Sequence, residues 1–524
     1  MFPLYLVLQV TVFHLFHFVL IHKGSEAVFR FVFFFQNALF LSIIRPHAII
    51  PALPSERKRK IRMYGFLRNF RVFFAILLCK LLRAFSRLLH RGGTAMPGRI
   101  ALKFCPDLLV ILSKEVRTIA VTGTNGKTTC SRMIEEACSA ADKDYFSNRS
   151  GANLLSGVTT EFVMNASLTG KMRKHTAVIE CDEAAARRVF GQLQPAVIVV
   201  TNLFRDQLDR YGEITHTLSN IREGIRAVPD AVLCLNADCS LTASLSLEDL
   251  PNPIRWFGVD GLPNASTAAG LLSDASHCIR CKAEYVYDYH TYAHLGGFRC
   301  PRCGYHRQRP DYAVTEILKM DDRHSEVRFR TPSGETILSI NLPAVYNLYN
   351  AAAAYAAASS FGCSDESCTE ALSRFSCGFG RMESFPLAGG TRMILVKNPA
   401  GCTQALDFLT HITQSFLFVF CLNDRDADGT DVSWIWDADF EMLQSITDHI
   451  PSIVVSGDRA ADMRLRLKYA GLDDEKILVI QEPSEVVRYL SGEHLPVYIL
   501  PTYTAMLDLR KEVVRYCGGT EFWE

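Results

Sequence analysis

The chain has 524 residues, of which 48% are hydrophobic and 21% charged, and this composition excludes a disordered, collagen-like or small disulfide-bonded protein. Lysine and arginine together number 56 and aspartate and glutamate 55, so the formal net charge of +1 favours neither nucleic acid nor an acidic surface as a partner. The 17 cysteines, odd in number and partly clustered, indicate a reducing compartment.

The N-terminal region differs from the rest of the chain, because only two of its first 106 residues are acidic. Residues 1–21 form an apolar run long enough to span a bilayer, but they lack the basic segment and the cleavage site of a signal peptide. A second apolar stretch covers 27–51. We therefore interpret 1–62 as an extension that is either membrane-associated or not translated, with Met63 as the start of the cellular protein.

A basic amphipathic helix is predicted within the next segment, 63–114. Its residues Lys80, Arg83, Arg87 and Arg91 recur at spacings of three and four, which places them on one helical face. Two interpretations remain: the helix lies on an anionic membrane surface, or it docks on the body of the protein with its basic face in water. The protein is accordingly expected in the cytoplasm, either free or peripheral at the inner face of the cell membrane.

The body of the chain alternates short β-branched runs with helical stretches, which predicts an α/β fold with parallel sheets buried on both faces. The runs of the first sheet are 118–122, 176–179, 196–201 and 231–235. Those of a second, smaller, Rossmann-like domain are 392–396, 416–422, 452–456, 476–480 and 497–500. A stretch with proline and glycine at 385–390 separates the two, so we predict domains at 115–384 and 385–524.

A glycine-rich turn joins the first predicted strand to a helical pattern at 130–141. This context is typical of a phosphate-binding loop, because backbone N–H groups surround phosphate oxygens and the helix N-terminus adds positive potential. Lys127 is expected to reach the terminal phosphates of a nucleotide, and the Thr128 hydroxyl to ligate Mg²⁺. The predicted loop consists of Gly123, Thr124, Asn125, Gly126, Lys127, Thr128 and Thr129.

The loop sequence Gly-Thr-Asn-Gly-Lys-Thr-Thr resembles the ATP-binding loop of the Mur ligases and folylpolyglutamate synthases, which activate a carboxylate as an acyl phosphate for attack by an amine. The resemblance implies that Glu180, at the end of the second strand, binds Mg²⁺. Further segments match the family's ATP-site motifs in order, and their candidate residues are Asn202, Asn236, Asp238, Asn347 and Arg381. One departure is informative, because 213–227 contains no lysine where many Mur ligases carry a carbamylated one.

Four cysteines within the first domain form a metal-binding pattern, C-x₂-C-x₁₈-C-x₂-C. Two close cysteine pairs supply four thiolates to a tetrahedral Zn²⁺ and leave no open position, so the metal is predicted to be structural. The residues between the pairs are not notably basic, which argues against nucleic acid as a ligand. The predicted zinc ribbon spans 274–308, and its ligands are Cys278, Cys281, Cys300 and Cys303.

A Mur-type core that carries a four-cysteine ribbon resembles the MurT family, the ATP-binding subunits of lipid II isoglutaminyl synthase, over roughly residues 68–524. In that family a separate glutaminase subunit, GatD, docks on the C-terminal domain and supplies ammonia. An aspartate of MurT is thought to complete the glutaminase triad by orienting its histidine. The resemblance therefore implies a heterodimer whose second subunit is a glutaminase.

The acidic loop at 423–437 contains the candidates for that aspartate. Its alternating aspartates mimic a Ca²⁺ loop, but position twelve is Ile435 instead of the required glutamate, which excludes Ca²⁺. Asp437 is preferred over Asp431 because it lies beyond the two tryptophans of the loop rather than within the turn. The Asn-Pro-Ala-Gly segment at 398–401 either faces the acyl phosphate or the ammonia path, or is a plain turn.

These observations predict an α/β ligase with a Mur ligase-like P-loop domain, an inserted zinc ribbon and a C-terminal Rossmann-like domain. The resemblance implies that ATP and Mg²⁺ phosphorylate the α-carboxylate of D-glutamate in lipid II, and that ammonia then displaces phosphate to give D-isoglutamine. One alternative is an amino-acid-adding Mur ligase or a folylpolyglutamate synthase-like ligase. A more remote alternative is a zinc-ribbon regulator that binds nucleotides.

Overall fold

The computed structural model describes residues 54–88, 95–149, 151–205, 214–247, 249–260, 274–376 and 381–518, with the backbone alone at 54–67 and 381. The chain divides into two compact units, Met1–Leu67 and Arg68–Glu524. The apolar runs at 1–21 and 27–51 lie outside the described residues. Among the helices that are described, none combines the length and the apolar character needed to cross a bilayer.

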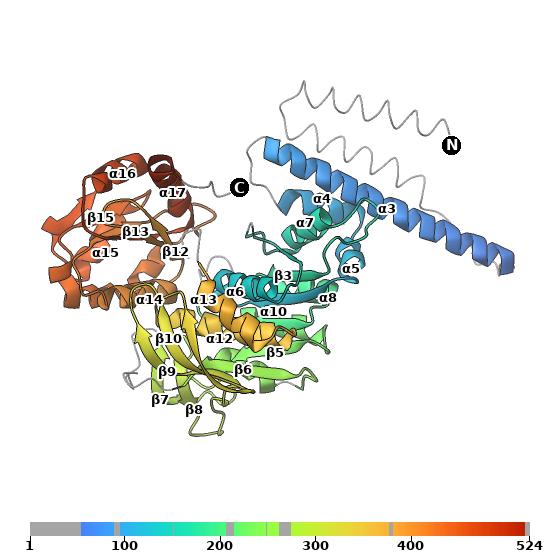
Figure 1. Cartoon of the computed structure of the whole chain (residues 1–524), viewed down its shortest axis with the longest axis horizontal. Helices are drawn as coiled ribbons and strands as arrows, with labels where there is room; N and C mark the ends of the chain where they lie inside the picture. The colour runs from blue at the N-terminus through green and yellow to red at the C-terminus, as the bar shows by residue number, and fades with distance from the viewer. Residues whose placement is uncertain are drawn as a thin grey trace. The chain divides into compact units, whose positions relative to one another are not determined.

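The larger sheet has nine strands in the order β11-β10-β9-β6-β5-β4-β1-β3-β2. Figure 1 labels β3, β5, β6, β9 and β10 of this sheet. All neighbours from β2 across to β9 are parallel, and β9, β10 and β11 pair antiparallel. The strands are β1 (Arg117–Thr122), β2 (Tyr145–Ser147), β3 (Thr176–Glu180), β4 (Val197–Val200), β5 (Val232–Asn236), β6 (Ile254–Val259), β9 (Tyr312–Met320), β10 (Ser325–Thr331) and β11 (Gly334–Ile340). The predicted parallel α/β sheet is confirmed, and its four predicted strands are β1, β3, β4 and β5.

Two apolar cores cover the two faces of this sheet. In β1, Ile119 and Val121 belong to one core and Ala120 to the other, because successive side chains of a strand point to opposite faces. The helices of the first face are α6 (Lys127–Ala140), α12 (Val345–Ser360) and α13 (Asp365–Arg374). Those of the second are α4 (Ala95–Phe104), α5 (Leu108–Ser113), α7 (Leu155–Asn165), α8 (Ala186–Leu193) and α10 (Ile214–Arg226). A short helix, α11 (Ser240–Ala243), and a 3₁₀ turn, η1 (Ser244–Leu247), follow β5.

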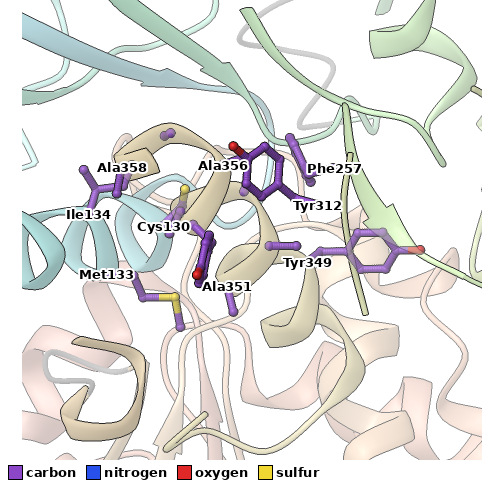
Figure 2. Close-up of a cluster of buried hydrophobic side chains, with 14 of the residues drawn as sticks. Cys130, Met133, Ile134, Phe257, Tyr312, Tyr349, Ala351, Ala356 and Ala358 are labelled. Carbon is purple, nitrogen blue, oxygen red and sulfur yellow. The ribbon is translucent and has the colours of Figure 1, made fainter. Parts of the chain in front are cut away.

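The alanine-rich helix α12 is buried along almost its whole length. Figure 2 shows its residues Ala351, Ala356 and Ala358 among larger side chains, including Met133 and Ile134 of α6. Small side chains let neighbouring helices and strands approach closely, so α12 is held in a fixed position between α6 and the sheet. Its first turn is thereby brought to the glycine loop, which precedes α6.

A hairpin of β7 (Val286–Tyr292) and β8 (Leu295–Arg299) is inserted between β6 and β9. It packs with the second cysteine pair around a small aromatic core of its own. This core contains Tyr285, Phe298 and Tyr305.

The C-terminal sheet has the order β12-β13-β17-β14-β15-β16 and is parallel except for β12. Its strands are β12 (Arg381–Phe385), β13 (Thr391–Ile394), β14 (Leu417–Cys421), β15 (Ile453–Ser456), β16 (Ile477–Val479) and β17 (Val497–Pro501). Its helices are α14 (Pro399–Thr410), α15 (Ala460–Tyr469), α16 (Pro483–Ser491) and α17 (Tyr503–Cys517), with 3₁₀ turns η2 (Ser433–Trp436), η3 (Phe440–His449) and η4 (Asp474–Lys476). All five predicted strands occur, and β12 adds an edge strand that the sequence analysis did not predict. The acidic loop follows β14, next to the point where the strand order changes direction.

The N-terminal helix α3 (Pro54–Leu88) packs on the second face through buried residues such as Ile76 and Cys79. The expectation for its basic residues needs correction, since Lys80 and Arg83 are half-buried and the Lys80 ammonium donates to the Ala166 carbonyl at 2.5 Å. Arg91 lies outside the described residues. The exposed residues of α3 are mixed, since Phe70, Phe73, Leu81, Phe85 and Leu88 occur together with Arg68, Arg71 and Arg87.

Candidate active site and metal centre

The glycine loop lies between β1 and α6 and needs glycine at two positions. Gly123 has a φ of +122°, and a Cβ there would lie 2.4 Å from Oγ1 of Thr201. Gly126 has a φ of +83°, and a Cβ there would lie 2.0 Å from Oδ1 of Asn350 on α12. Both residues therefore serve close approach as well as left-handed backbone conformation.

The segment after β4 holds this loop through backbone and amide hydrogen bonds. The Thr124 N–H donates to the Asn202 carbonyl at 2.9 Å, and the Asn125 N–H donates to Oδ1 of Asn202 at 2.9 Å. The Thr201 hydroxyl donates to the Asn125 carbonyl at 2.7 Å. Asn202, predicted as an ATP-site residue, thus lies against the loop and fixes its curvature.

Lys127, the first residue of α6, is almost completely buried and pairs with Glu183. Its ammonium lies 3.2 and 3.3 Å from the two Glu183 carboxylate oxygens and also donates to the Thr124 carbonyl at 3.2 Å. Burial raises the pKa of Glu183 above its ordinary value, although the charges of Lys127 and Lys397 oppose that shift. Glu183 and Lys397 were not predicted as site residues. The only sequence signal for them is that each follows a predicted strand.

Thr128 and Glu180 form the second pair beside the loop. The Thr128 hydroxyl donates to Oε2 of Glu180 at 2.8 Å. The Asn148 side chain holds the backbone of Glu180, because its amide donates to the Glu180 carbonyl at 2.8 Å and its Oδ1 accepts from the Glu180 N–H at 2.9 Å. A hydroxyl and a carboxylate so placed are the oxygen ligands that Mg²⁺ prefers, so these residues fit the predicted ion.

A pocket next to the loop brings several predicted residues together. It is lined from the first domain by Asn125, Gly126, Thr129, Asn202, Tyr292, Tyr346, Asn347 and Asn350, and from β12 onward by Met382, Ile394, Leu395, Gly401, Gln404 and Ala405. The Asn347 amide donates to the Pro343 carbonyl at 2.7 Å, and its Oδ1 accepts from the Asn350 amide at 3.2 Å. Asn347 therefore has a fixed orientation at the wall of a pocket that adjoins the phosphate-binding loop.

Asn236 and Asp238 do not line this pocket. The Asn236 amide donates to the Thr201 carbonyl at 2.9 Å, behind the loop. The fully buried Asp238 carboxylate accepts from Tyr349 at 2.6 Å and from Arg307 at 2.5 Å. Desolvation raises the pKa of Asp238, and Arg307 partly offsets that shift. The side chain of Arg381, the remaining predicted residue, lies outside the described part of the structure.

The Asn398 side chain connects the C-terminal domain to the glycine loop. Its Oδ1 accepts from the Gly401 N–H at 2.8 Å and so caps α14. Its amide donates to Oδ1 of Asn125 at 3.0 Å. The segment at 398–401 is therefore a helix cap in contact with the loop, which favours the first of the two interpretations left open for it.

The four predicted cysteine ligands lie together. All four sulfur atoms are within 4.8 Å of one another, with Cys278 and Cys303 3.5 Å apart and Cys281 and Cys300 3.4 Å apart. Each pair forms the same turn, in which a backbone N–H four residues on donates to the carbonyl of the first cysteine. Four thiolates on two such turns fit a tetrahedral Zn²⁺ without a free position.

The two candidate aspartates of the acidic loop are both exposed. The Asp437 carboxylate lies 3.3 Å from the Arg205 guanidinium, which belongs to the segment after β4. Oδ1 of Asp431 accepts from the Ser433 N–H at 2.8 Å, and the Ser433 hydroxyl and N–H lower the pKa of Asp431. Asp437 alone of the two contacts the domain that carries the glycine loop, among the contacts of the described residues.

Comparison with known proteins agrees with this fold. The Mur ligase middle domain matches residues 121–264, and the MurT ligase C-terminal domain matches residues 395–506. MurF from Acinetobacter baumannii has a similar structure, with a TM-score of 0.58, 19% sequence identity and 80% of each chain covered. The parallel sheet, the glycine loop with its lysine and the Thr128–Glu180 pair define an ATP-dependent enzyme of the Mur ligase fold.

Two relatives are similar over most of their length. The MurT subunit of the glutamine-hydrolyzing lipid II isoglutaminyl synthase of Streptococcus pneumoniae is 36% identical over 425 residues, which cover 81% of this chain and 92% of that protein. The same subunit of Staphylococcus aureus is 32% identical over 458 residues, which cover 86% of this chain and 99% of that protein. The chain belongs to the MurT family.

The cysteine cluster yields a prediction for metal content. Cys278→Ser removes one of four thiolate ligands, so native mass spectrometry of the purified chain should show loss of zinc and the melting temperature should fall by roughly 5 °C or more. Cys517→Ser is the matched control, because Cys517 lies outside the cluster. Unchanged zinc content in Cys278→Ser would contradict the site.

Proposed function

We propose that this chain is the ATP-using subunit of a lipid II isoglutaminyl synthase and that it amidates the α-carboxylate of D-glutamate in the lipid II stem peptide. The glycine loop with its Lys127–Glu183 and Thr128–Glu180 pairs carries this proposal, in a chain similar to MurT subunits over 81–86% of its length. The product is D-isoglutamine, which places the activity in peptidoglycan synthesis.

The reaction follows from what the site residues offer. A carboxylate oxygen of the substrate attacks the terminal phosphorus of ATP, ADP leaves, and the resulting acyl phosphate loses phosphate when ammonia attacks its carbonyl carbon. Thr128 and Glu180 would hold Mg²⁺, which supplies charge neutralisation to the phosphates when bound. Glu183 and the loop carbonyls hold the Lys127 ammonium beside the loop, where it stabilises the charge of the transferring group.

Lys397 supports this assignment from the other domain. It follows β13 and precedes the helix cap of Asn398, and its charge acts on buried Glu183. The charges of Lys127 and Lys397, which come from two domains, therefore both act on the Glu183 carboxylate. Positive charge from two domains suits the negative charge that a nucleotide and a carboxylate substrate bring to the site.

The word subunit in the relatives' names indicates a partner complex, and we infer that the partner is a glutaminase of the GatD type. An exposed apolar patch supports a docking surface beside Asp437, since Trp436, Leu465 and Tyr469 are 48%, 47% and 71% exposed. The Trp436 and Tyr469 rings pack edge to face at 5.6 Å, so the patch is partly preorganised. Through Arg205, Asp437 is connected to the segment that holds the glycine loop, which keeps the ammonia source close to the acyl phosphate.

Lys127→Ala tests the proposed function. The substitution removes the ammonium at the loop and should lower amidation of lipid II and the accompanying ATP hydrolysis by about 100-fold or more, measured at a temperature where circular dichroism shows the variant to be folded. The measurement is steady-state turnover by the complex with glutamine, ATP and lipid II. Lys114→Ala is the matched control, because Lys114 is an exposed lysine outside the loop. Normal amidation by Lys127→Ala would contradict the assignment.

Asp437→Asn tests the inferred contact with the glutaminase. If Asp437 orients the partner's histidine, the variant should lose roughly 100-fold or more in glutamine-driven amidation, while amidation with free ammonium stays near the wild-type rate. Asp431→Asn is assayed in parallel, and it should behave like the wild type with both nitrogen sources. Equal loss of both activities in Asp437→Asn would remove the triad assignment.

We further propose that α3 lies on the inner face of the membrane, close to a lipid-linked substrate. Its exposed residues from Phe70 to Leu88 combine five large apolar side chains with Arg71 and Arg87, and Glu56 is the one acidic residue of α3. A helix of this kind inserts its apolar face between headgroups while flanking cations contact anionic lipids.

Leu81→Ser/Phe85→Ser checks this contact, since the two side chains are 57% and 46% exposed. Loss of two apolar anchors should weaken sedimentation with vesicles that contain phosphatidylglycerol by about tenfold. Ile337→Ser on β11, where the side chain is 53% exposed, is the control. Equal vesicle binding by the double variant and the control would argue against the membrane contact.

A further inference from the structure

A second pocket, of about 750 Å³, shares no lining residue with the nucleotide pocket. Its walls are α4, the first turn of α7, the segment after β3, α8 and α10. None of the predicted site residues lines it. The family motifs of the sequence analysis therefore do not account for this pocket.

The pocket is strongly cationic. Arg99 and Lys103, one turn apart on α4, face Arg187 and Arg188 of α8 across it, and His216 of α10 adds an imidazole. Arg187 shares its charge with Glu223 at 3.3 Å. Even when the charge of Arg187 is taken as neutralised by Glu223, the lining residues carry more positive than negative charges.

Asp182 is the single carboxylate among the lining residues, and it is 5% exposed. Its Oδ1 accepts from the Ala184 N–H at 3.0 Å, and its single negative charge is outnumbered by the cations of the lining. A surplus of exposed guanidinium groups around a concave surface favours an anionic ligand over a neutral one.

The pocket adjoins the place where phosphoryl transfer would occur. Asp182 stands between Glu180, which pairs with Thr128, and Glu183, which pairs with Lys127. One short segment after β3 therefore forms a wall of both sites. A substrate whose carboxylate reaches the loop would extend its remaining groups into this pocket.

Arginine is suited to phosphate because its planar fork of N–H donors matches two phosphate oxygens at once. The pocket also contains Leu102, Leu154 and Leu155, which offer apolar contact to sugar or lipid carbons next to the anion.

We propose that this pocket binds the diphosphate of the substrate through Arg99, Lys103 and Arg188. The proposal rests on the proposed function, because it names how the same substrate is held. A diphosphate reaches such a site either on a polyprenyl lipid or on a uridine nucleotide.

The experiment compares three muramyl-pentapeptides as substrates of the complex with its glutaminase partner, at saturating glutamine and ATP. The first is lipid II in detergent micelles, the second is the UDP-linked peptide, and the third lacks the diphosphate. Arg99→Gln/Arg188→Gln removes two guanidinium contacts, so kcat/KM should fall about tenfold or more on diphosphate substrates, with the KM for ATP unchanged. On the peptide without diphosphate, wild type and variant should agree within about twofold.

Lys171→Gln/Arg488→Gln removes two exposed cations outside the pocket and is the matched control. Arg99→Lys/Arg188→Lys keeps the charge and should recover part of the loss, which separates recognition from misfolding. Loss on lipid II alone identifies the lipid-borne diphosphate as the ligand, and loss on both diphosphate substrates identifies diphosphate in general. Equal loss on all three substrates, or no loss on any, would overturn the pocket assignment. A wild-type complex that amidates none of the three would instead contradict the proposed function itself.

Discussion

The geometry of the site depends on one asparagine, Asn125, whose backbone and side chain are held from two directions. Its N–H and carbonyl bond to Asn202 and Thr201 of the segment after β4, and its side-chain amide exchanges hydrogen bonds with Asn398 of the C-terminal domain. The side chains of Asn202, Thr201 and Asn398 are uncharged, so the hydrogen bonds that hold Asn125 act through their directional geometry rather than through net charge. The N–H groups of the loop are thereby held in position to bind an anionic ligand. The contact between Asn398 and Asn125 also couples the loop to the C-terminal domain.

Charged side chains from several segments surround this loop. Lys127 and Lys397 act on buried Glu183, and Arg205 pairs with Asp437 at the edge of the acidic loop. The arginine-lined pocket is a separate group of charges, and Asp182 of the segment after β3 lines it. Under the proposed function, the acidic loop lies next to the ammonia source, the glycine loop holds the nucleotide, and the arginine-lined pocket holds the substrate anion. An amide-forming ligase that takes its nitrogen from another subunit needs these three positions to adjoin.

The sequence allowed the parts with strong local signals to be predicted. The strands β1, β3, β4 and β5 are continuous apolar runs, and the cysteine pairs have fixed spacing, so both appear where they were expected. The antiparallel strands β9–β11 were missed because the prediction relied on continuous apolar runs, whereas β10 alternates polar and buried apolar residues as a half-buried strand does. Lys80 and Arg83 were expected on an exposed face but are half-buried, because they interact with Ala166 and Glu161, a tertiary contact that helical spacing does not reveal. The cationic pocket could not be found either, since five separate segments create it.

The most direct test of acyl-phosphate chemistry at this loop is to trace a carboxylate oxygen of the substrate into the released phosphate. Lipid II is prepared with ¹⁸O in the α-carboxylate of its D-glutamate and is incubated with the complex, ATP and glutamine. If the carboxylate is phosphorylated before ammonia attacks, each released phosphate carries one labelled oxygen, and mass spectrometry detects it in proportion to the amide formed. Formation of the amide together with unlabelled phosphate would contradict the mechanism.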